Sequence, residues 1–172
     1  MGKSAILLAA LLAIAALPAP SSARPAGLPP QSPPQSPPRT VECDDASAGV
    51  GVAPAGAPRV GPFHMLGSRE SGSHWNPATK RFTSKVPVVV AGSAPVLVSV
   101  PERLAGRLAL IYGGAGHRSL STEINFVPCA GRSATFFPGG MVFTRREPIS
   151  LLVQPDGWAK PEPLRLGVFG PY

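Results

Sequence analysis

Short apolar runs separated by glycine, proline, asparagine and aspartate fill residues 59–172, and they constrain the fold more than any other feature of the chain. Several runs alternate in the way that is typical of a half-buried strand, and Val96, Val98 and Val100 share one face by this rule. No run has the period of a helix longer than two turns. Strands are expected at 60–66, 85–90, 95–100, 107–112, 122–127, 134–137, 141–144, 149–153 and 164–169.

This spacing predicts an all-β fold. Strands that recur about every eight to fifteen residues, with turns between them, indicate a single antiparallel β-sandwich of the Ig-like or jelly-roll-like type. Prolines inside or beside the runs suit strand starts, edges and bulges. Roughly 110 residues are enough for one hydrophobic core, so we expect one domain at 59–172.

The N-terminal residues predict export. Lys3 lies in a short basic start, residues 5–17 are apolar, and Pro18 and small residues precede an expected cleavage site after Ala23. This order is that of a signal peptide at 1–23, and the apolar run is shorter than the roughly 20 residues of a membrane-spanning helix. The mature chain is therefore expected to have no transmembrane span, and to be secreted, extracellular or associated with the cell wall.

Residues 24–58 are rich in proline, glycine and alanine and include a tandem Gln-Ser-Pro-Pro. Proline fixes the backbone angle φ and cannot donate a backbone hydrogen bond, so such a segment favours extended, solvated chain over a packed core. We interpret 24–58 as a flexible, disordered linker. A docking peptide for a proline-recognising domain is the alternative.

The chain has two cysteines, Cys43 and Cys129. An exported chain with two cysteines most simply forms one disulfide, because the compartment is oxidising. A nucleophilic role for Cys129 would need a base and a lowered thiol pKa, and no local motif supplies them. The sequence therefore favours a Cys43–Cys129 bridge.

Motifs of catalysis and cofactor binding are absent from the sequence. It contains no Gly-x-Ser-x-Gly elbow, phosphate-binding loop or His-Glu-x-x-His, and no paired Cys or His spacing for zinc. We therefore predict a non-enzymatic module without cofactor or metal. The alternative is a small hydrolase whose site is assembled from dispersed residues, and its first candidates are Ser73, His74, His117 and Glu123.

Charge is the global property that points to a partner. From residue 59 onward the chain has thirteen Lys and Arg against six Asp and Glu. A basic surface attracts polyanions, so anionic polymers or lipids of the cell envelope are the expected partners, and nucleic acid is not expected for an exported protein. A basic surface without a specific partner is the alternative.

Two tryptophans lie in polar, turn-rich segments next to basic residues. Exposed tryptophan can stack on sugars or ligand cations, but each tryptophan could instead fold back over one end of the sandwich. The candidate contact residues for a ligand or anion are Trp75, Trp158, Lys80, Arg81, Arg145 and Arg146.

The order of motifs resembles a group of small secreted actinobacterial proteins of unknown function. The resemblance rests on RVGPFHMLG, KVPVVVAGSAPVLVSVPERLAGRLALIY, INFVPC and FFPGGMVF, and covers residues 59–153. It implies a secreted or cell-surface β-sandwich with a hairpin at the Gly-Gly pair, and it implies no activity. Members of the group often have a cysteine after this pair, where the chain reads TRREPISLLV. This difference leaves two alternatives: Cys43 replaces that cysteine as the partner of Cys129, or both thiols are free or intermolecular.

Overall fold

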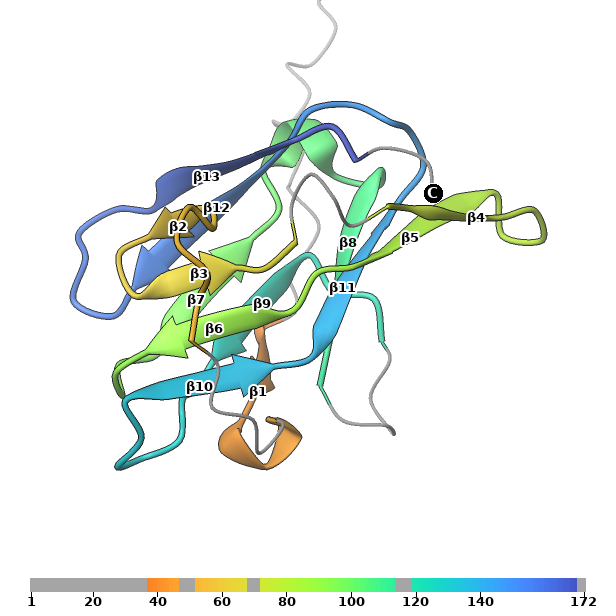
Figure 1. Ribbon diagram of the computed structural model, residues 1–172. Coiled ribbons are helices and arrows are strands. Elements are labelled where there is room, and N and C mark those ends of the chain that lie inside the picture. The colour runs from red at the N-terminus through yellow and green to blue at the C-terminus, as the bar shows by residue number, and fades with distance from the viewer. Residues whose placement is uncertain (1–36, 47–51, 68–71, 114–118, 170–172) are drawn as a thin grey trace, which may run out of the picture. The chain divides into compact units, whose positions relative to one another are not determined.

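The computed structural model describes residues 37–46, 52–67, 72–113 and 119–169 (Figure 1). The predicted signal peptide at 1–23 lies outside the described residues. The described residues form strands and two short 3-10 helices, η1 (Cys43–Asp45) and η2 (Glu102–Leu104). The strands are β1 (Arg39–Val41), β2 (Arg59–Val60), β3 (Phe63–Met65), β4 (His74–Asn76), β5 (Arg81–Lys85), β6 (Val88–Ala91), β7 (Val96–Ser99), β8 (Leu108–Tyr112), β9 (Glu123–Phe126), β10 (Ala134–Phe137), β11 (Gly139–Phe143), β12 (Ile149–Pro155) and β13 (Glu162–Gly167).

The strands form three sheets that pack together. Their orders are β1-β9-β7-β12-β13, β10-β6-β3-β2 and β4-β5-β11-β8. All strand pairs in them are antiparallel except β1 with β9, which is parallel. The predicted all-β sandwich is therefore confirmed.

Two of the sheets are continuous through one long strand pair. Strands β5 and β6 are separated only by Val86 and Pro87, and β10 and β11 only by Pro138. The register continues across the break, because Phe137 pairs with Val88 on one side and Gly140 with Lys85 on the other. Proline has no backbone N–H to donate to a ladder, so the pairing is interrupted where the strands pass from one sheet to the next.

The Gly-Gly pair does not form the hairpin that the resemblance implies. Gly139 and Gly140 begin β11, in the middle of the long strand pair. A Cβ on Gly139 would lie 2.2 Å from Cδ1 of Tyr112, and one on Gly140 would lie 2.1 Å from the carbonyl oxygen of Ser84. Glycine is required here by the close approach of neighbouring strands and not by a turn.

The core centres on Phe126 of β9, where the three sheets meet. Its ring lies 5.7 Å from that of Phe63 on β3, 5.2 Å from Phe137 on β10 and 5.1 Å from Tyr112 on β8. All four side chains are buried. The Tyr112 hydroxyl donates a hydrogen bond to the Val86 carbonyl, and burial raises the pKa of Tyr112 well above its usual value of 10.0.

The ordered domain begins earlier than residue 59. The range interpreted as a linker contains β1, whose Val41 is fully buried and pairs with Phe126. Strand β1 is only three residues long, and its parallel partner lies more than eighty residues away in the sequence. A segment of this kind has no local pattern that distinguishes it from linker.

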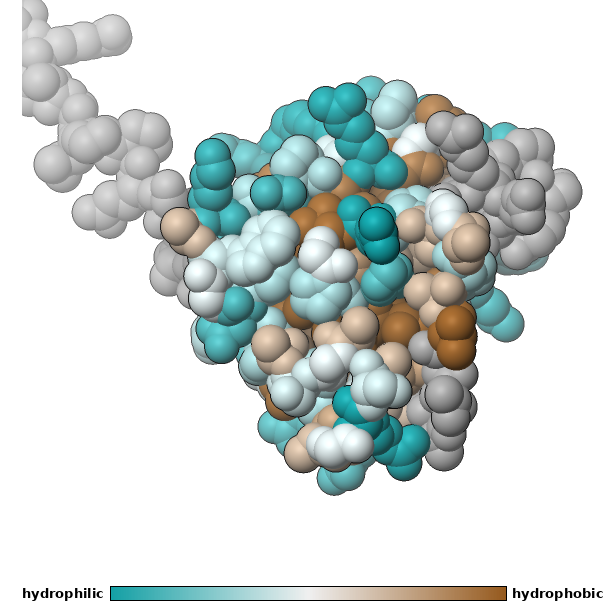
Figure 2. Space-filling model, turned by 60° about the vertical axis from the view of Figure 1, so that its left-hand side comes forward, coloured by the Kyte–Doolittle hydropathy of each residue, from teal (hydrophilic) through white to brown (hydrophobic). Residues whose placement is uncertain are grey.

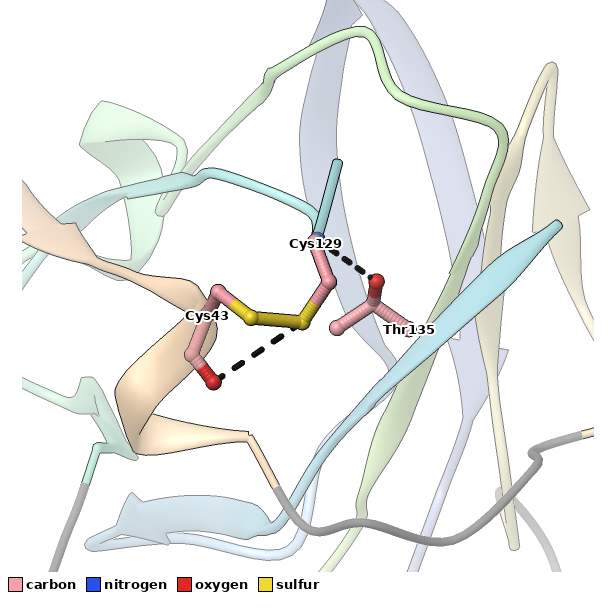
Figure 3. Close-up of a disulfide and its surroundings, with 3 residues drawn as sticks. All are labelled: Cys43, Cys129 and Thr135. Carbon is pink, nitrogen blue, oxygen red and sulfur yellow. Dashed lines mark hydrogen bonds between the residues drawn. A yellow bond between two sulfur atoms is a disulfide. The ribbon is translucent and has the colours of Figure 1, made fainter. Parts of the chain in front are cut away.

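The Cys43–Cys129 disulfide is confirmed (Figure 3). The two Cα atoms are 4.8 Å apart, and the bridge joins η1 to the segment that follows β9. The Cys129 amide donates a hydrogen bond of 2.8 Å to Oγ1 of the buried Thr135. Because β1 and β9 run in parallel toward the two cysteines, the bridge closes this strand pair at its end.

The other differences from the expected strands are local. The expected strand 60–66 is a hairpin of β2 and β3, which turns at Gly61 with φ of 51°. The strand expected at 85–90 is divided at Pro87, and β4 was not expected. Among the residues that the structure describes, no helix has the length and apolar character to cross a membrane.

Candidate ligand-binding site

Strands β4 and β5 form a hairpin that extends from the body of the domain (Figure 1). The Asn76 side-chain oxygen accepts hydrogen bonds from the amides of Ala78 (3.0 Å) and Thr79 (3.3 Å), which fixes the turn. Lys80 completes the turn with a φ of 52°, in the left-handed region. Strand β4 is at the sheet edge, and all three of its residues are exposed.

A row of aromatic rings runs from this edge into the core. The rings of Trp75 and Phe82 are 4.6 Å apart, Phe82 lies 5.5 Å from Phe143, and Phe143 lies 5.8 Å from Phe169. Trp75 is 41% exposed, whereas Phe143 and Phe169 are buried. Trp75, Phe82 and Phe143 face one another because they occupy directly paired positions on β4, β5 and β11.

Arg146 lies on the same row of rings. Its guanidinium carbon is 4.7 Å from the centre of the Phe82 ring, which is a cation–π contact. Arg146 is exposed, and no acidic side chain of the described residues forms an ion pair with it. We call Trp75, Phe82 and Arg146 the aromatic–arginine cluster.

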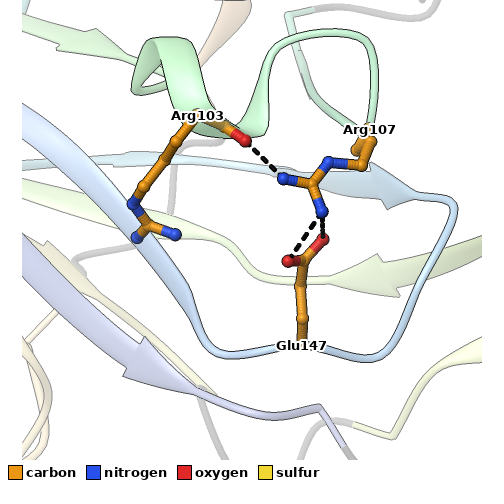
Figure 4. Close-up of polar contacts among 3 residues, drawn as sticks. All are labelled: Arg103, Arg107 and Glu147. Atoms are coloured by element: carbon orange, nitrogen blue, oxygen red, sulfur yellow. Dashed lines mark hydrogen bonds and ion pairs between the residues drawn. The ribbon is translucent and has the colours of Figure 1, made fainter.

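The loop that carries Arg146 is held by Arg107 (Figure 4). One nitrogen of the Arg107 guanidinium contacts both carboxylate oxygens of Glu147, at 2.8 and 2.9 Å, and another donates to the Arg103 carbonyl. The Thr144 amide also donates a hydrogen bond of 3.0 Å to the Arg107 carbonyl. Because Thr144 and Glu147 flank Arg146, these contacts restrict the loop on both sides of it.

Three other predicted contact residues lie near the cluster in the fold. Lys80 and Arg81 belong to the β4–β5 hairpin, and Arg145 precedes Arg146 in the same loop. Arg81 is next to Phe82 on a strand, so its side chain points to the opposite face of the sheet. No acidic side chain of the described residues forms an ion pair with Lys80, Arg81 or Arg145.

The turn between β12 and β13, which contains Trp158, lies away from the β4–β5 hairpin (Figure 1). The ring of Trp158 packs over the β2–β3 turn, where a Cβ on Gly61 would lie 3.0 Å from Cζ2 of Trp158. Its main chain is tied to the turn by the Gln154 side-chain amide, which donates to the Trp158 carbonyl at 2.9 Å. Trp158 therefore folds back over the sandwich, as the alternative expects. The structure does not bring Trp75 and Trp158 together.

Figure 2 shows the side of the molecule that lies on the left in Figure 1. Among its coloured residues, hydrophobic groups form separate areas between hydrophilic ones. A continuous hydrophobic patch would mark an interface with another protein or a membrane. This part of the described surface has no such patch.

The surroundings of His64 change its acidity. His64 lies on β3 and pairs with Arg59 of β2. Partial burial, and secondarily the positive charge of Arg59, lower the pKa of His64 below its usual value of 6.5. The residue lies in a different sheet from the aromatic–arginine cluster.

Three residues of the hydrolase alternative lie in the described part of the chain. Ser73 is buried before β4, His74 is exposed on β4, Glu123 begins β9 in another sheet, and His117 lies outside the described residues. The structure adds no observation in favour of this alternative. Among the described residues, no three His, Cys, Asp or Glu side chains are placed to hold a metal ion.

The fold and these contacts define the class as an all-β sandwich with an exposed aromatic–arginine cluster at a sheet edge. Comparisons with protein-family models, with curated proteins and with solved structures find no match to this chain. The candidate function therefore rests on the cluster and its charge.

Proposed function

We propose that the chain is an exported, non-enzymatic β-domain that binds anionic polymers or lipids of the cell envelope. The observation that carries the proposal is a group of four basic residues, Lys80, Arg81, Arg145 and Arg146, without acidic partners among the described residues. Two short segments hold these residues, on the β4–β5 hairpin and the β11–β12 loop.

Positive charge that has no acidic partner among the described residues, on two adjacent segments, favours an extended anionic ligand. Such charges attract polyanions over distances of about a Debye length, which is about 10 Å at 0.1 M salt. Arginine and lysine bind carboxylates and phosphates by charge-assisted hydrogen bonds. Binding should therefore be strongest at low salt and weaken as salt is added.

Export is part of this proposal and has its own test. The disulfide supports it, because disulfides form and persist mainly in oxidising compartments. Peptide mapping of the protein from the producing cell should find a mature N-terminus at Arg24. Retention of residues 1–23 in the mature protein would contradict export by a cleaved signal peptide.

Cosedimentation with isolated envelope material and with anionic vesicles tests binding. The variant Lys80→Gln/Arg81→Gln/Arg145→Gln/Arg146→Gln should lose most of the low-salt binding. The matched control is Arg59→Gln/Arg132→Gln/Lys160→Gln/Arg165→Gln, which removes the same residue types from other exposed positions. Absence of binding by the natural chain at low salt would refute the function, and equal losses in both variants would refute the location.

A further inference from the structure

We propose that the aromatic–arginine cluster is a subsite for one acidic sugar residue of a polymer. The sugar ring would lie on the indole of Trp75, and its carboxylate would bind the guanidinium of Arg146. The inference deepens the proposed function and rests on it, since it names the ligand class at the same surface.

Trp75 supplies a supported aromatic face. Trp75 is 41% exposed at a sheet edge, although a residue of this size is usually well buried. The contact with Phe82 at 4.6 Å, and through Phe82 with Phe143, supports the ring, and part of Trp75 remains exposed. An exposed and fixed aromatic face suits the apolar C–H face of a sugar ring, because little side-chain freedom is lost on binding.

Arg146 supplies a positive charge on the same row of rings. Its guanidinium lies 4.7 Å from the centre of the Phe82 ring, and the Trp75 indole lies 4.6 Å from the same ring, so both groups contact one side chain. The cation–π contact leaves the N–H donors of the guanidinium available, and no hydrogen bond to another described residue uses them. A planar guanidinium with unused donors suits a carboxylate, which it can bind through two parallel hydrogen bonds.

The combination of an aromatic face and a guanidinium distinguishes an acidic sugar both from other anions and from uncharged sugars. Polyphosphate would satisfy Arg146 but offers no apolar face to Trp75, and an uncharged sugar would satisfy Trp75 but not Arg146. Because β4 is an edge strand with all of its residues exposed, the adjacent units of a polymer can extend past the hairpin on either side.

A fluorescence titration with a galacturonic acid oligomer tests the subsite. The chain has two tryptophans, so in the Trp158→Phe background Trp75 is the only source of indole emission. We expect the oligomer to change this emission, and we expect the fully methyl-esterified oligomer, which keeps the rings but lacks the charge, to bind at least about tenfold more weakly.

Two variants locate the site, with affinity measured by calorimetry. Trp75→Ala and Arg146→Gln should each weaken binding of the acid oligomer about tenfold. Arg165→Gln is the matched control, because it removes an exposed arginine from another sheet and should leave affinity unchanged. Unfolding curves of all three variants show whether each remains folded.

The outcomes separate this inference from the proposed function. If Arg146→Gln and Arg165→Gln weaken binding equally, or if Trp75→Ala has no effect, the subsite is refuted while general binding of polyanions stands. Equal affinity for the acid and the ester, or for the acid oligomer and polyphosphate, also refutes the subsite. Failure of envelope material and vesicles to bind at low salt refutes the proposed function, whatever the sugar titration gives.

Discussion

Removal of the disulfide should lower the free energy of unfolding by about 4 to 5 kcal/mol. The bridge spans a sequence separation of 86 residues, and the chain-entropy model gives this value for a loop of such length. This loss of free energy is an upper estimate, because the reduced unfolded chain is more compact than a random coil. The perturbation is Cys43→Ser/Cys129→Ser, and the assay is urea denaturation of both proteins under the same conditions.

The structure also predicts where the variant opens first. Strand β1 has three paired residues, and burial of Val41 contributes about 2 kcal/mol. Ordering its three residues costs about 3 to 6 kcal/mol, at about 1 to 2 kcal/mol each, so burial of Val41 alone does not hold β1 in place without the bridge. Opening of β1 should therefore precede global unfolding in the variant.

Amide exchange distinguishes this local opening from global loss of stability. The Val127 amide donates to the Val41 carbonyl, so its protection depends on β1. The Val86 amide donates to Gly139 inside the long strand pair and does not depend on β1. In the variant, protection of Val127 should fall below that of Val86. A loss of less than about 1 kcal/mol together with a protected Val127 would refute the reasoning.

Three further predictions concern packing and pH. Gly140→Ala should lower the free energy of unfolding by more than about 2 kcal/mol in urea denaturation, because a Cβ would lie 2.1 Å from the Ser84 carbonyl oxygen. Gly92→Ala is the comparison, because a Cβ there meets open space but the residue has a φ of 76°. It should lower the free energy of unfolding by about 1 kcal/mol. Since burial raises the pKa of Tyr112, the domain should lose stability as the pH rises above 10.0. Tyr112→Phe should remove this dependence of stability on pH, although it also removes the hydrogen bond to the Val86 carbonyl. Since the pKa of His64 is lowered, stability should fall as the pH decreases below 6.5, and thermal unfolding of His64→Gln should show a smaller fall; an equal fall in both proteins would contradict this.

The sequence predicts strands well where alternation and burial coincide. Strands β7, β8, β9 and β12 each alternate buried and partly exposed residues, and all were expected near their observed positions. Strand β4 has three exposed residues and therefore no alternation to detect. Strand β1 depends on a distant parallel partner and on the disulfide, so its pairing cannot be predicted from local pattern.

The candidate residues were easier to predict than their grouping. Trp75, Arg81 and Arg146 were expected as contacts from residue type alone, but their relation depends on the register of β4, β5 and β11. Arg81 illustrates the difference, because the expected strand began at residue 85 and gave no basis for assigning Arg81 and Phe82 to opposite faces. Phe82, which joins Trp75 to Arg146, was not among the expected contacts for the same reason.

The disulfide and the aromatic–arginine cluster belong to different parts of the fold, so stability and binding can be separated. Cys43 and Cys129 close the pair of β1 and β9, whereas the cluster rests on β4, β5 and the loop after β11. Phe82 connects the cluster to the buried Phe143 and Phe169, and neither residue belongs to β1 or β9. A cysteine variant that remains folded should therefore keep the ligand affinity of the natural chain. Unchanged affinity would identify Cys129 as a structural cysteine, since a reactive thiol at the site would couple its oxidation state to binding.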